Sequence, residues 1–477
     1  MSSSTTIPAV ISSVAFLQLL SSGAMDSLVE GFFGLSVLSQ MALLAILFAI
    51  VFLAVEISHF IGRPSPAGDG LKKATVTTLP APPVSYPLDK LNQCANDKEK
   101  FLAIYPMLRD EMLSHMDSNE MPAEAIEWCK TMMDYTVPGG KLNRGLTVIA
   151  VHRTLVQASD ARDLTNEEVA KASVLGWAIE FLQAFFLVAD DVMDASKTRR
   201  GQPCWYMLDH VKNIAINDSF LLESYVFTMI RFHFGKEDYY LQLVELFLQV
   251  VQQTEFGQLL DLTSQDEASG EVDLSRFSLD RYKKIVKYKT AFYTFYLPVA
   301  IGMITSGVKD AEAFELAKTI CCEMGEYFQV QDDYLDCFGD PEVIGKGMSL
   351  LFCKSVWIQP LPYGELPVSL NFSFPLSQSS LLVGTDIQDN KCSWLVVQAL
   401  DRVTPTQRKT LEENYGQWDD SKVANIKALY KDLDLSNVFE TYEEDSYKRI
   451  QTQLDKVTLM PRDVFELLLK KIYKRSK

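Results

Sequence analysis

The spacing of apolar residues predicts a protein built mainly from helices. Between Leu91 and Gly345 apolar side chains recur every three or four positions, and glycine and proline rarely interrupt them. One clear example consists of Leu241, Val244, Leu248, Val251, Phe256, Leu259 and Leu260. This period matches the turn of an α-helix and not the alternation of a β-strand. We therefore expect an all-α fold, in which long helices form a bundle around a central cavity.

A separate apolar run near the N-terminus is long enough to cross a membrane. No charged residue occurs between Phe32 and Val55, and Gln40 is the only strongly polar one. As a helix this run would be about 36 Å long, which exceeds the hydrocarbon core of a bilayer. The sequence therefore predicts a tail over 1–30, a transmembrane helix over 31–57 and a flexible linker over 58–90.

Charges on either side of this run indicate its orientation. Asp26 and Glu30 precede it, whereas Arg63, Lys72 and Lys73 follow it. Because cytoplasmic flanks carry an excess of Lys and Arg, we expect the rest of the chain to face the cytosol, anchored in the endoplasmic reticulum or another membrane. Two alternatives stay open: the run never inserts and the protein is cytoplasmic, or a mis-assigned start codon joins unrelated upstream sequence.

The helical pattern fails between Lys346 and Gly384. This stretch has one acid, Glu365, one lysine, Lys354, four prolines and many serines. We interpret 347–382 as an insertion of about 36 residues, which is far longer than an ordinary helix connection. Its two ends can be encoded by splice-site-like codons, so one hypothesis is a retained intron that impairs the protein. The alternative is a genuine loop that bulges outward at modest entropic cost.

Composition narrows the range of functions. The chain of 477 residues has a net charge of −17, which argues against nucleic acid as a partner because phosphate backbones are bound by surplus Lys and Arg. The 8 cysteines show no C-x-x-C spacing. They indicate reduced thiols in the cytosol, without a metal-binding or catalytic role.

Two aspartate-rich segments carry the strongest chemical signal. They contain Asp190, Asp191 and Asp194 in the first and Asp332, Asp333 and Asp336 in the second. On a helix, residues four apart share a face, so each segment crowds carboxylates that repel unless a cation lies between them. Mg²⁺ retains several waters and prefers one or two carboxylates plus phosphate oxygens. The segments therefore predict a magnesium-diphosphate site between two facing helices.

The neighbours of these segments extend the prediction. Gln183 precedes the first segment by two turns, and Gln329 precedes Asp333 by one. The adjacent Arg199 and Arg200 follow the first segment, and their planar guanidinium groups suit phosphate oxygens. A single acidic triplet is explained equally well by a solvated helix face. Two such triplets with these neighbours favour a site for a second, metal-free diphosphate beside the first.

These motifs, together with the segments at 139–145, 287–290 and 384–391, resemble the trans-isoprenyl diphosphate synthases, and among them those that make farnesyl diphosphate. The resemblance runs from about Leu91 to the C-terminus with one break at 347–382. It implies an isoprenoid-synthase helical bundle over 91–477 and a homodimer. It also implies head-to-tail condensation of dimethylallyl diphosphate, and then geranyl diphosphate, with isopentenyl diphosphate to give (E,E)-farnesyl diphosphate.

The resemblance assigns roles to individual residues. The six aspartates would hold Mg²⁺, about three ions per active site. Catalytic roles fall to Lys289, Thr290 and Gln329. The expected substrate-binding residues are Lys141, Arg144, Gln183, Arg199, Arg200, Lys289, Thr290, Gln329, Lys346 and Lys391. Phe185 and Phe186, one turn before the first aspartates, would form a floor that stops the growing product at fifteen carbons.

Three other functions share parts of this pattern. A terpene cyclase is disfavoured because the second segment is Asp-rich and because Lys141 and Arg144 suggest an acceptor site. A geranylgeranyl or other short-chain synthase differs mainly at Phe185 and Phe186. A catalytically impaired splice form could instead act as a subunit partner.

Overall fold

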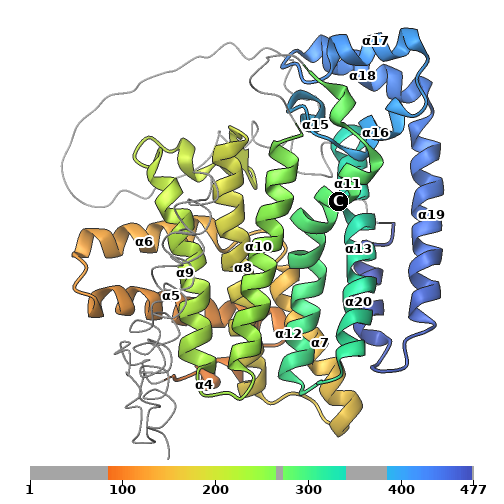
Figure 1. The fold of residues 1–477 in the computed structure, drawn as a ribbon. Coiled ribbons are helices and arrows are strands. Elements are labelled where there is room, and N and C mark those ends of the chain that lie inside the picture. Colours follow the sequence, from red (N-terminus) through yellow and green to blue (C-terminus); the bar gives the residue numbers. More distant parts are fainter. Residues whose placement is uncertain (1–83, 265–271, 340–383, 475–477) are drawn as a thin grey trace, which may run out of the picture. The chain divides into compact units, whose positions relative to one another are not determined.

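The structure is a computed structural model of the chain, and it describes residues 84–264, 272–339 and 384–474 (Figure 1). Residues 81–477 form one compact unit. The predicted transmembrane helix at 31–57, most of the linker and the insertion at 347–382 lie outside the described residues. The same holds for Lys346.

Helices dominate the described residues, so the predicted all-α class is confirmed. The longer helices are α5 (Asp97–Ser118), α6 (Ala123–Thr136), α7 (Asn143–Asp160), α8 (Asn166–Met193), α9 (Ile214–Phe234), α10 (Tyr240–Leu262), α13 (Ala311–Phe338), α18 (Asp420–Asp432) and α19 (Leu435–Leu454). The shorter helices are α4 (Leu88–Leu91), α11 (Leu279–Val286), α12 (Leu297–Thr305), α15 (Thr385–Gln388), α16 (Trp394–Leu400), α17 (Pro405–Asn414) and α20 (Asp463–Ile472). The remaining elements are two strands, β1 (Thr198–Arg199) and β2 (Gln202–Pro203), two 3₁₀ turns, η1 (Trp205–Met207) and η2 (Leu274–Arg276), and a π-helix, η3 (Lys287–Tyr296).

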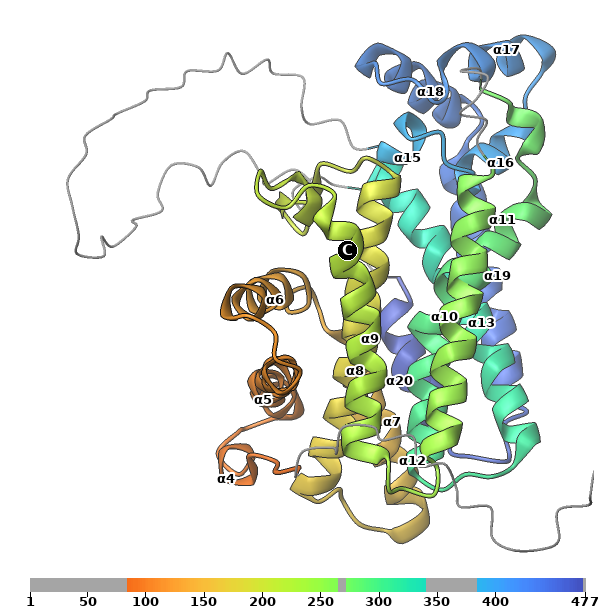
Figure 2. The same cartoon turned by 60° about the vertical axis from the view of Figure 1, so that its left-hand side comes forward.

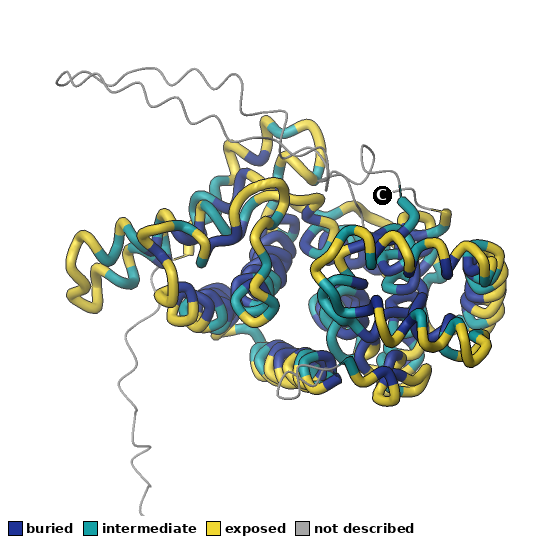
Figure 3. The backbone as a smooth tube through the Cα atoms, turned by 90° about the horizontal axis from the view of Figure 1, so that it is seen from above, coloured by how far each residue is buried: buried dark blue, intermediate teal, exposed yellow. Residues whose placement is uncertain are grey.

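Two long helices organise the bundle, and each carries one aspartate segment near its C-terminal end. α8 packs against α7 and α9, whereas α13 packs against η3 and α19. Helices α4, α5 and α6 lie to one side, next to α8 and α9, whereas α15 to α18 gather at one end of the bundle (Figure 2). Seen along the bundle, buried residues line its interior and exposed residues face outward (Figure 3).

Local signals explain why α8 forms and where it begins. The Thr165 hydroxyl accepts a hydrogen bond from the Glu168 amide, and the Glu168 carboxylate accepts one from the Thr165 amide, which completes a capping box.

Within the described ranges α8 is the one helix long and apolar enough to cross a membrane, but 78% of its most apolar window is buried. Trp177 in this window stacks on Phe101 at 4.5 Å between ring centroids. α8 is therefore the central core helix of the bundle.

The π-helix η3 is a departure that the apolar spacing did not predict. η3 lies between α10 and α13, and both neighbours contribute a glycine at the contact. A Cβ atom at Gly257 would lie 2.1 Å from the Lys289 backbone nitrogen, and one at Gly325 would lie 2.3 Å from the Ala291 Cβ. The widened helix is thus held closely on both sides, and π-helices occur frequently at functional sites.

Candidate active site

The first aspartate segment faces cationic side chains from three other parts of the chain. Arg199 donates to Asp191 at 2.5 Å between Nη2 and Oδ1, and to Asp190 at 3.5 Å. Asp190 also accepts from the Gln258 amide at 3.0 Å and from the Lys289 ammonium at 3.2 Å. The α8 carboxylates therefore face a cluster of donors from the hairpin, α10 and η3.

A seventh aspartate, which the sequence did not single out, connects two predicted lysines. Asp261 on α10 is 6% exposed, and its Oδ2 accepts from Lys289 at 2.6 Å and from Lys391 at 3.3 Å. Lys391 also donates to Asp194 at 2.7 Å. Asp261 and Gln258 stand one turn apart on an amphipathic helix, which gave no sequence signal beyond ordinary helical periodicity.

The direction of the pKa shift differs among these carboxyl groups. Burial alone would raise the pKa of Asp190, but the charges of Lys289, Lys391 and Arg199 outweigh burial and lower that pKa. Burial raises the pKa of Asp194, and repulsion from Asp190 raises it further. The same two lysines hold the pKa of Asp261 below its usual value against the effect of burial. The cluster thus combines crowded negative charge with tightly held positive charge.

In the second aspartate segment, hydrogen bonds hold the buried Asp333. Asp333 accepts from the Gln329 amide at 3.0 Å and from the Trp394 backbone amide at 2.7 Å. Burial raises the pKa of Asp333 to about 7. Gln329 in turn accepts from the Thr290 hydroxyl at 3.0 Å, so the predicted pair Thr290 and Gln329 is in direct contact.

The end of α13 connects to the segment that follows the insertion. Asp336 accepts from the Thr385 hydroxyl at 2.8 Å and from the Asp386 amide at 3.1 Å, at the start of α15. Asp332 lies half-buried on the same helix. The chain around 384–391 thus binds Asp336 of the second segment directly, and through Lys391 it binds Asp194 of the first.

The donors at both segments are of the type that a divalent cation requires. They are carboxylate oxygens, which suit hard ions such as Mg²⁺. The repulsion between Asp190 and Asp194 is the kind of crowding that a cation relieves. Within the described ranges, no three acidic, histidine or cysteine side chains converge on one position. This arrangement fits an ion bound by one or two carboxylates, with other oxygens completing its shell.

The two adjacent arginines point to different places because a tight hairpin separates them. β1 and β2 pair antiparallel, and Arg200 and Gly201 between them have φ values of 53° and 77°. Left-handed pairs of this kind form two-residue hairpin turns. Arg199 binds Asp191, whereas Arg200 donates to the Pro138 carbonyl at 3.2 Å, beside the 139–140 glycine pair.

Arg144 lies at the start of α7, between α8 and η3. Its Nη2 donates to the Thr294 hydroxyl at 2.9 Å and to the Tyr293 hydroxyl at 3.0 Å. When the Gln183 amide on α8 is oriented so that its nitrogen faces Glu180, its oxygen accepts from Arg144 Nη1 at 3.0 Å. Lys141 is exposed just before α7. The predicted residues Arg144 and Gln183 are therefore in contact, on the side of α8 where Arg200 lies near the 138–140 loop.

Phe185 and Phe186 lie on α8 about one turn before the first aspartates, towards the middle of the helix. Their ring centroids are 4.6 Å apart, and Phe186 lies 6.1 Å from the ring of Tyr293. Phe185 is buried and Phe186 is half-buried. Two rings at this position can close the interior of the bundle.

Two cavities are lined by residues of the predicted site, and the smaller one contacts both Asp191 and Arg200. One of about 490 Å³ is lined by Asp194, Lys391, Lys197 and Trp418. Another of about 170 Å³ is lined by Arg199, Arg200 and the 139–140 glycine pair. Each of them includes residues that the sequence predicted for a diphosphate site.

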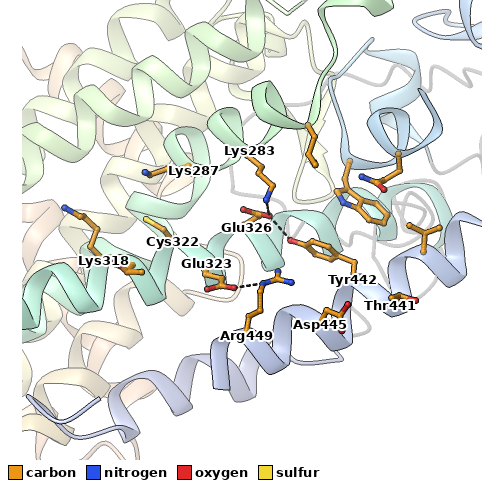
Figure 4. Close-up of a pocket in the computed structure, with 15 residues that line it drawn as sticks. Lys283, Lys287, Lys318, Cys322, Glu323, Glu326, Thr441, Tyr442, Asp445 and Arg449 are labelled. Atoms are coloured by element: carbon orange, nitrogen blue, oxygen red, sulfur yellow. Dashed lines mark hydrogen bonds and ion pairs between the residues drawn. The ribbon is translucent and has the colours of Figure 1, made fainter. Parts of the chain in front are cut away.

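A larger cavity, of about 680 Å³, lies away from the aspartates between α13 and α19 (Figure 4). Its acidic side chains are paired with bases: Glu323 with Arg449 at 2.9 Å, Glu326 with Lys283 at 3.3 Å and Asp445 with Lys448 at 3.7 Å. None of the predicted catalytic residues lines this cavity, so the candidate active site is the cluster around the two aspartate segments.

Comparison with known proteins identifies the family of this chain. The polyprenyl synthetase family matches residues 126–350 and 377–433, so the match is interrupted within the predicted insertion. The farnesyl pyrophosphate synthases of Gallus gallus and Candida albicans are 46% and 44% identical to this chain over 80% of its length, and the matches cover 93% and 98% of those proteins.

A solved structure gives the same result at the level of the fold. The crystal structure of T. brucei farnesyl diphosphate synthase is 34% identical, with a TM-score of 0.66, and the match covers 80% of this chain and 100% of that one. The resemblance inferred from the motifs is therefore confirmed. The chain belongs to the polyprenyl synthetase family and, within it, to the farnesyl diphosphate synthases.

Proposed function

We propose that this chain makes (E,E)-farnesyl diphosphate by condensing dimethylallyl diphosphate, and then geranyl diphosphate, with isopentenyl diphosphate. The observation that carries the proposal is the division of cationic side chains into two clusters. Arg199, Lys289 and Lys391 lie at the aspartates, whereas Arg144 and Arg200 lie on the other side, near Gln183 and the 138–140 loop. Two such clusters suit a reaction between two diphosphates, only one of which ionises.

The allylic substrate would bind at the aspartates. Its carbon–oxygen bond breaks and the diphosphate leaves with the electron pair, so positive charge beside that group lowers the barrier. Arg199, Lys289 and Lys391 would supply part of this charge, and Lys346 is proposed to join them. The family depends on divalent metal, and we propose three Mg²⁺ ions held by the six aspartates. Bound Mg²⁺ acts as a Lewis acid on the departing diphosphate.

Isopentenyl diphosphate would bind at the second cluster, through Lys141, Arg144, Arg200 and Gln183. Its diphosphate must stay attached, so a site with basic side chains and no metal suits it. The double bond of isopentenyl diphosphate then attacks the allylic cation and forms the new carbon–carbon bond. Thr290 and Gln329, whose side chains are in contact, would present oxygen atoms towards the developing positive charge. The released diphosphate would accept the proton that leaves.

Product length would be set by Phe185 and Phe186. Their contact with each other and with Tyr293 supports a closed end to the cavity. A chain that grows from the aspartates would meet these rings after two additions. A geranylgeranyl synthase would instead need a longer space at this position.

We also propose that the protein acts as a homodimer through the outer faces of α9 and α10. Exposed apolar side chains follow one face of each helix, and they are Ile216 and Phe220 on α9 and Leu241, Leu248, Phe256 and Leu259 on α10. Stripes of this kind on neighbouring helices are typical of protein interfaces. A membrane anchor through 31–57 would hold this unit at a cytosolic membrane surface.

Product analysis tests the proposed function. The full chain and a variant without residues 347–382 would each be incubated with dimethylallyl diphosphate, isopentenyl diphosphate and Mg²⁺, and the products identified by mass spectrometry. Farnesyl diphosphate from either form supports the function. Activity in the shortened form alone would show that the insertion impairs the protein. A longer product would point to a geranylgeranyl synthase, and no product from either form would contradict the proposal.

A further inference from the structure

We propose that Glu180, a residue outside the predicted site, positions Arg144 for isopentenyl diphosphate. Glu180 lies on α8, one turn before Gln183, and is 3% exposed. It acts through two other groups: the first turn of α7 and the side-chain amide of Gln183. This inference rests on the proposed function, because it assigns Arg144 to the acceptor diphosphate.

The first contact of Glu180 replaces a missing helix cap. α7 begins after Leu142, whose φ of 53° is left-handed and whose side chain makes no capping hydrogen bond. The amides of the first helical turn lack partners within the helix. Glu180 Oε1 accepts from the Gly145 amide at 2.9 Å, so a carboxylate from α8 caps α7. A negative group at this end is also favoured by the helix dipole.

Close packing of two glycines allows this contact. A Cβ atom at Gly176 would lie 2.6 Å from the Gly145 carbonyl oxygen, and one at Gly145 would lie 2.4 Å from the Phe101 ring. α7 and α8 therefore approach closely at this pair. Glu180 follows Gly176 by one helical turn, so its side chain lies on the same face of α8 and reaches the α7 backbone.

The second contact passes through Gln183 to the guanidinium group. The Gln183 amide nitrogen donates to Glu180 Oε2 at 3.1 Å, and its oxygen accepts from Arg144 Nη1 at 3.0 Å. A carboxylate only accepts and a guanidinium only donates, so this orientation of the amide satisfies both neighbours. With Thr294 and Tyr293 on the opposite side, Arg144 is held from α8 and from η3.

Glu180 orients Arg144 without neutralising it. Within the described residues Glu180 has no cation within ion-pair distance, so the guanidinium charge stays available for a phosphate. Burial raises the pKa of Glu180, while the more distant Arg144 and Arg200 charges lower it. Burying a carboxyl group without a cationic partner costs free energy. Because Glu180 forms no ion pair among the described residues, a structural ion pair does not account for its burial.

Glu180→Gln separates the capping of α7 from the positioning of Arg144. The oxygen of the new amide can still accept from the buried Gly145 amide, so the cap on α7 is kept. The nitrogen of the new amide would then face Gln183. The Gln183 amide must turn so that its oxygen accepts from this nitrogen, and its own nitrogen then faces the Arg144 guanidinium. The Gln183 nitrogen and the Arg144 guanidinium are both donors, so the hydrogen bond between them would be lost. We expect KM for isopentenyl diphosphate to rise about tenfold, because one hydrogen bond to a charged group is lost.

The measurement compares full chains in steady-state kinetics and in calorimetric titration with isopentenyl diphosphate. Glu180→Gln should raise KM for isopentenyl diphosphate, leave KM for geranyl diphosphate unchanged and leave the urea midpoint close to that of the unmutated chain. Glu180→Ala should show the same KM change with lower stability. Glu443→Gln is the matched control, since Glu443 also accepts from two neutral donors, Tyr327 at 2.9 Å and Gln331 at 2.8 Å, away from this site.

An unchanged KM in Glu180→Gln, together with lower stability in Glu180→Ala, would show that Glu180 is only a helix cap and would overturn the inference. Failure of the proposed function has a different signature, because the unmutated chain would then form no farnesyl diphosphate. In that case the calorimetric comparison alone decides. Equal affinities of the unmutated chain and Glu180→Gln for isopentenyl diphosphate would reject the positioning role.

Discussion

At the scale of single residues, the sequence revealed chemistry that is repeated or clustered and missed chemistry that is isolated. The paired aspartate segments and the two adjacent arginines were visible because like charges rarely crowd without a ligand. Asp261 and Glu180 were invisible, since each is a lone acid in an ordinary helical pattern. Only the packing of α10 against η3, and of α8 against α7, gives them partners.

Asp261→Asn tests the role of the isolated aspartate. Without its charge, the Lys289 and Lys391 ammonium groups lose their shared acceptor and repel each other. Breaking a buried ion pair by removing one partner costs about 3 kcal/mol of stability, and we expect kcat to fall about 100-fold as both lysines move. Urea denaturation and steady-state kinetics would measure these effects. Asp280→Asn, at an exposed pair with Lys284, should change neither, and an unchanged kcat in Asp261→Asn would refute the assignment.

Phe186→Ala tests the floor of the cavity. Removal of the ring opens space beside Phe185 and Tyr293, so the product chain can extend past fifteen carbons. We expect a shift towards geranylgeranyl diphosphate, measured by mass spectrometry of the reaction products. A product distribution identical to that of the unmutated chain would show that Phe186 is ordinary core packing.

At the scale of elements, apolar spacing predicted helices but not their irregularities. It could not predict η3, because a π-helix differs from an α-helix only in that each hydrogen bond spans five residues instead of four. Nor did the sequence predict the hairpin at 198–203, although Arg200 and Gly201 occupy its turn. Both irregular elements carry predicted site residues, which is where local rules most often fail.

Gly257→Ala tests the contact between α10 and η3. The added methyl group would lie 2.1 Å from the Lys289 backbone nitrogen, so η3 must shift and carry Lys289 and Thr290 with it. Overpacking of this kind costs about 1–3 kcal/mol, and kcat should fall with stability. Gly307→Ala is the control, since no atom lies within 4 Å of the position that its Cβ would take and only left-handed strain of about 1 kcal/mol applies. Equal kinetics in the two variants would contradict this close contact between α10 and η3.

The capping box of α8 gives a prediction about pH. A hydrogen bond from Arg162, together with those from Thr165, overcomes desolvation and lowers the pKa of Glu168 from its ordinary 4.5 to about 2. Because the folded-state pKa is lowered, the stabilisation is complete above pH 4.5 and is lost as pH falls towards 2. Glu168→Gln should therefore cost about 1 kcal/mol at about pH 7, where solvent screens the charge, and much less near pH 2. Urea titrations at both pH values measure this, and an equal cost at both would exclude the mechanism.

At the scale of the whole molecule, family membership and fold followed from the sequence, whereas the surface proposed for the dimer did not. Exposed apolar side chains on α9 and α10 look like any other helical positions until the neighbouring helices show which face is covered. The insertion at 347–382 was recognisable as a break in the helical pattern, and the family match is interrupted within it.

A charge placed on the α9 and α10 faces tests the dimer. Phe220→Asp and Leu248→Asp would each put a carboxylate into the proposed interface, where desolvation without a partner is costly. We expect the sedimentation coefficient to shift from that of a dimer to that of a monomer. Leu102→Asp on α5, also at an exposed apolar position, should leave the dimer intact. If all three variants sediment alike, the interface lies elsewhere.

The hairpin between β1 and β2 has a consequence for the geometry of bond formation. Arg199 and Arg200 are consecutive, yet one contacts the first aspartate segment and the other the loop at 138–140. In the proposed reaction each arginine would hold one substrate by its diphosphate. The separation of the two reacting carbons would then be set by a single rigid turn of the backbone. One extra residue inserted after Gly201 should slow bond formation even where both substrates still bind, because it would change the fixed spacing between donor and acceptor.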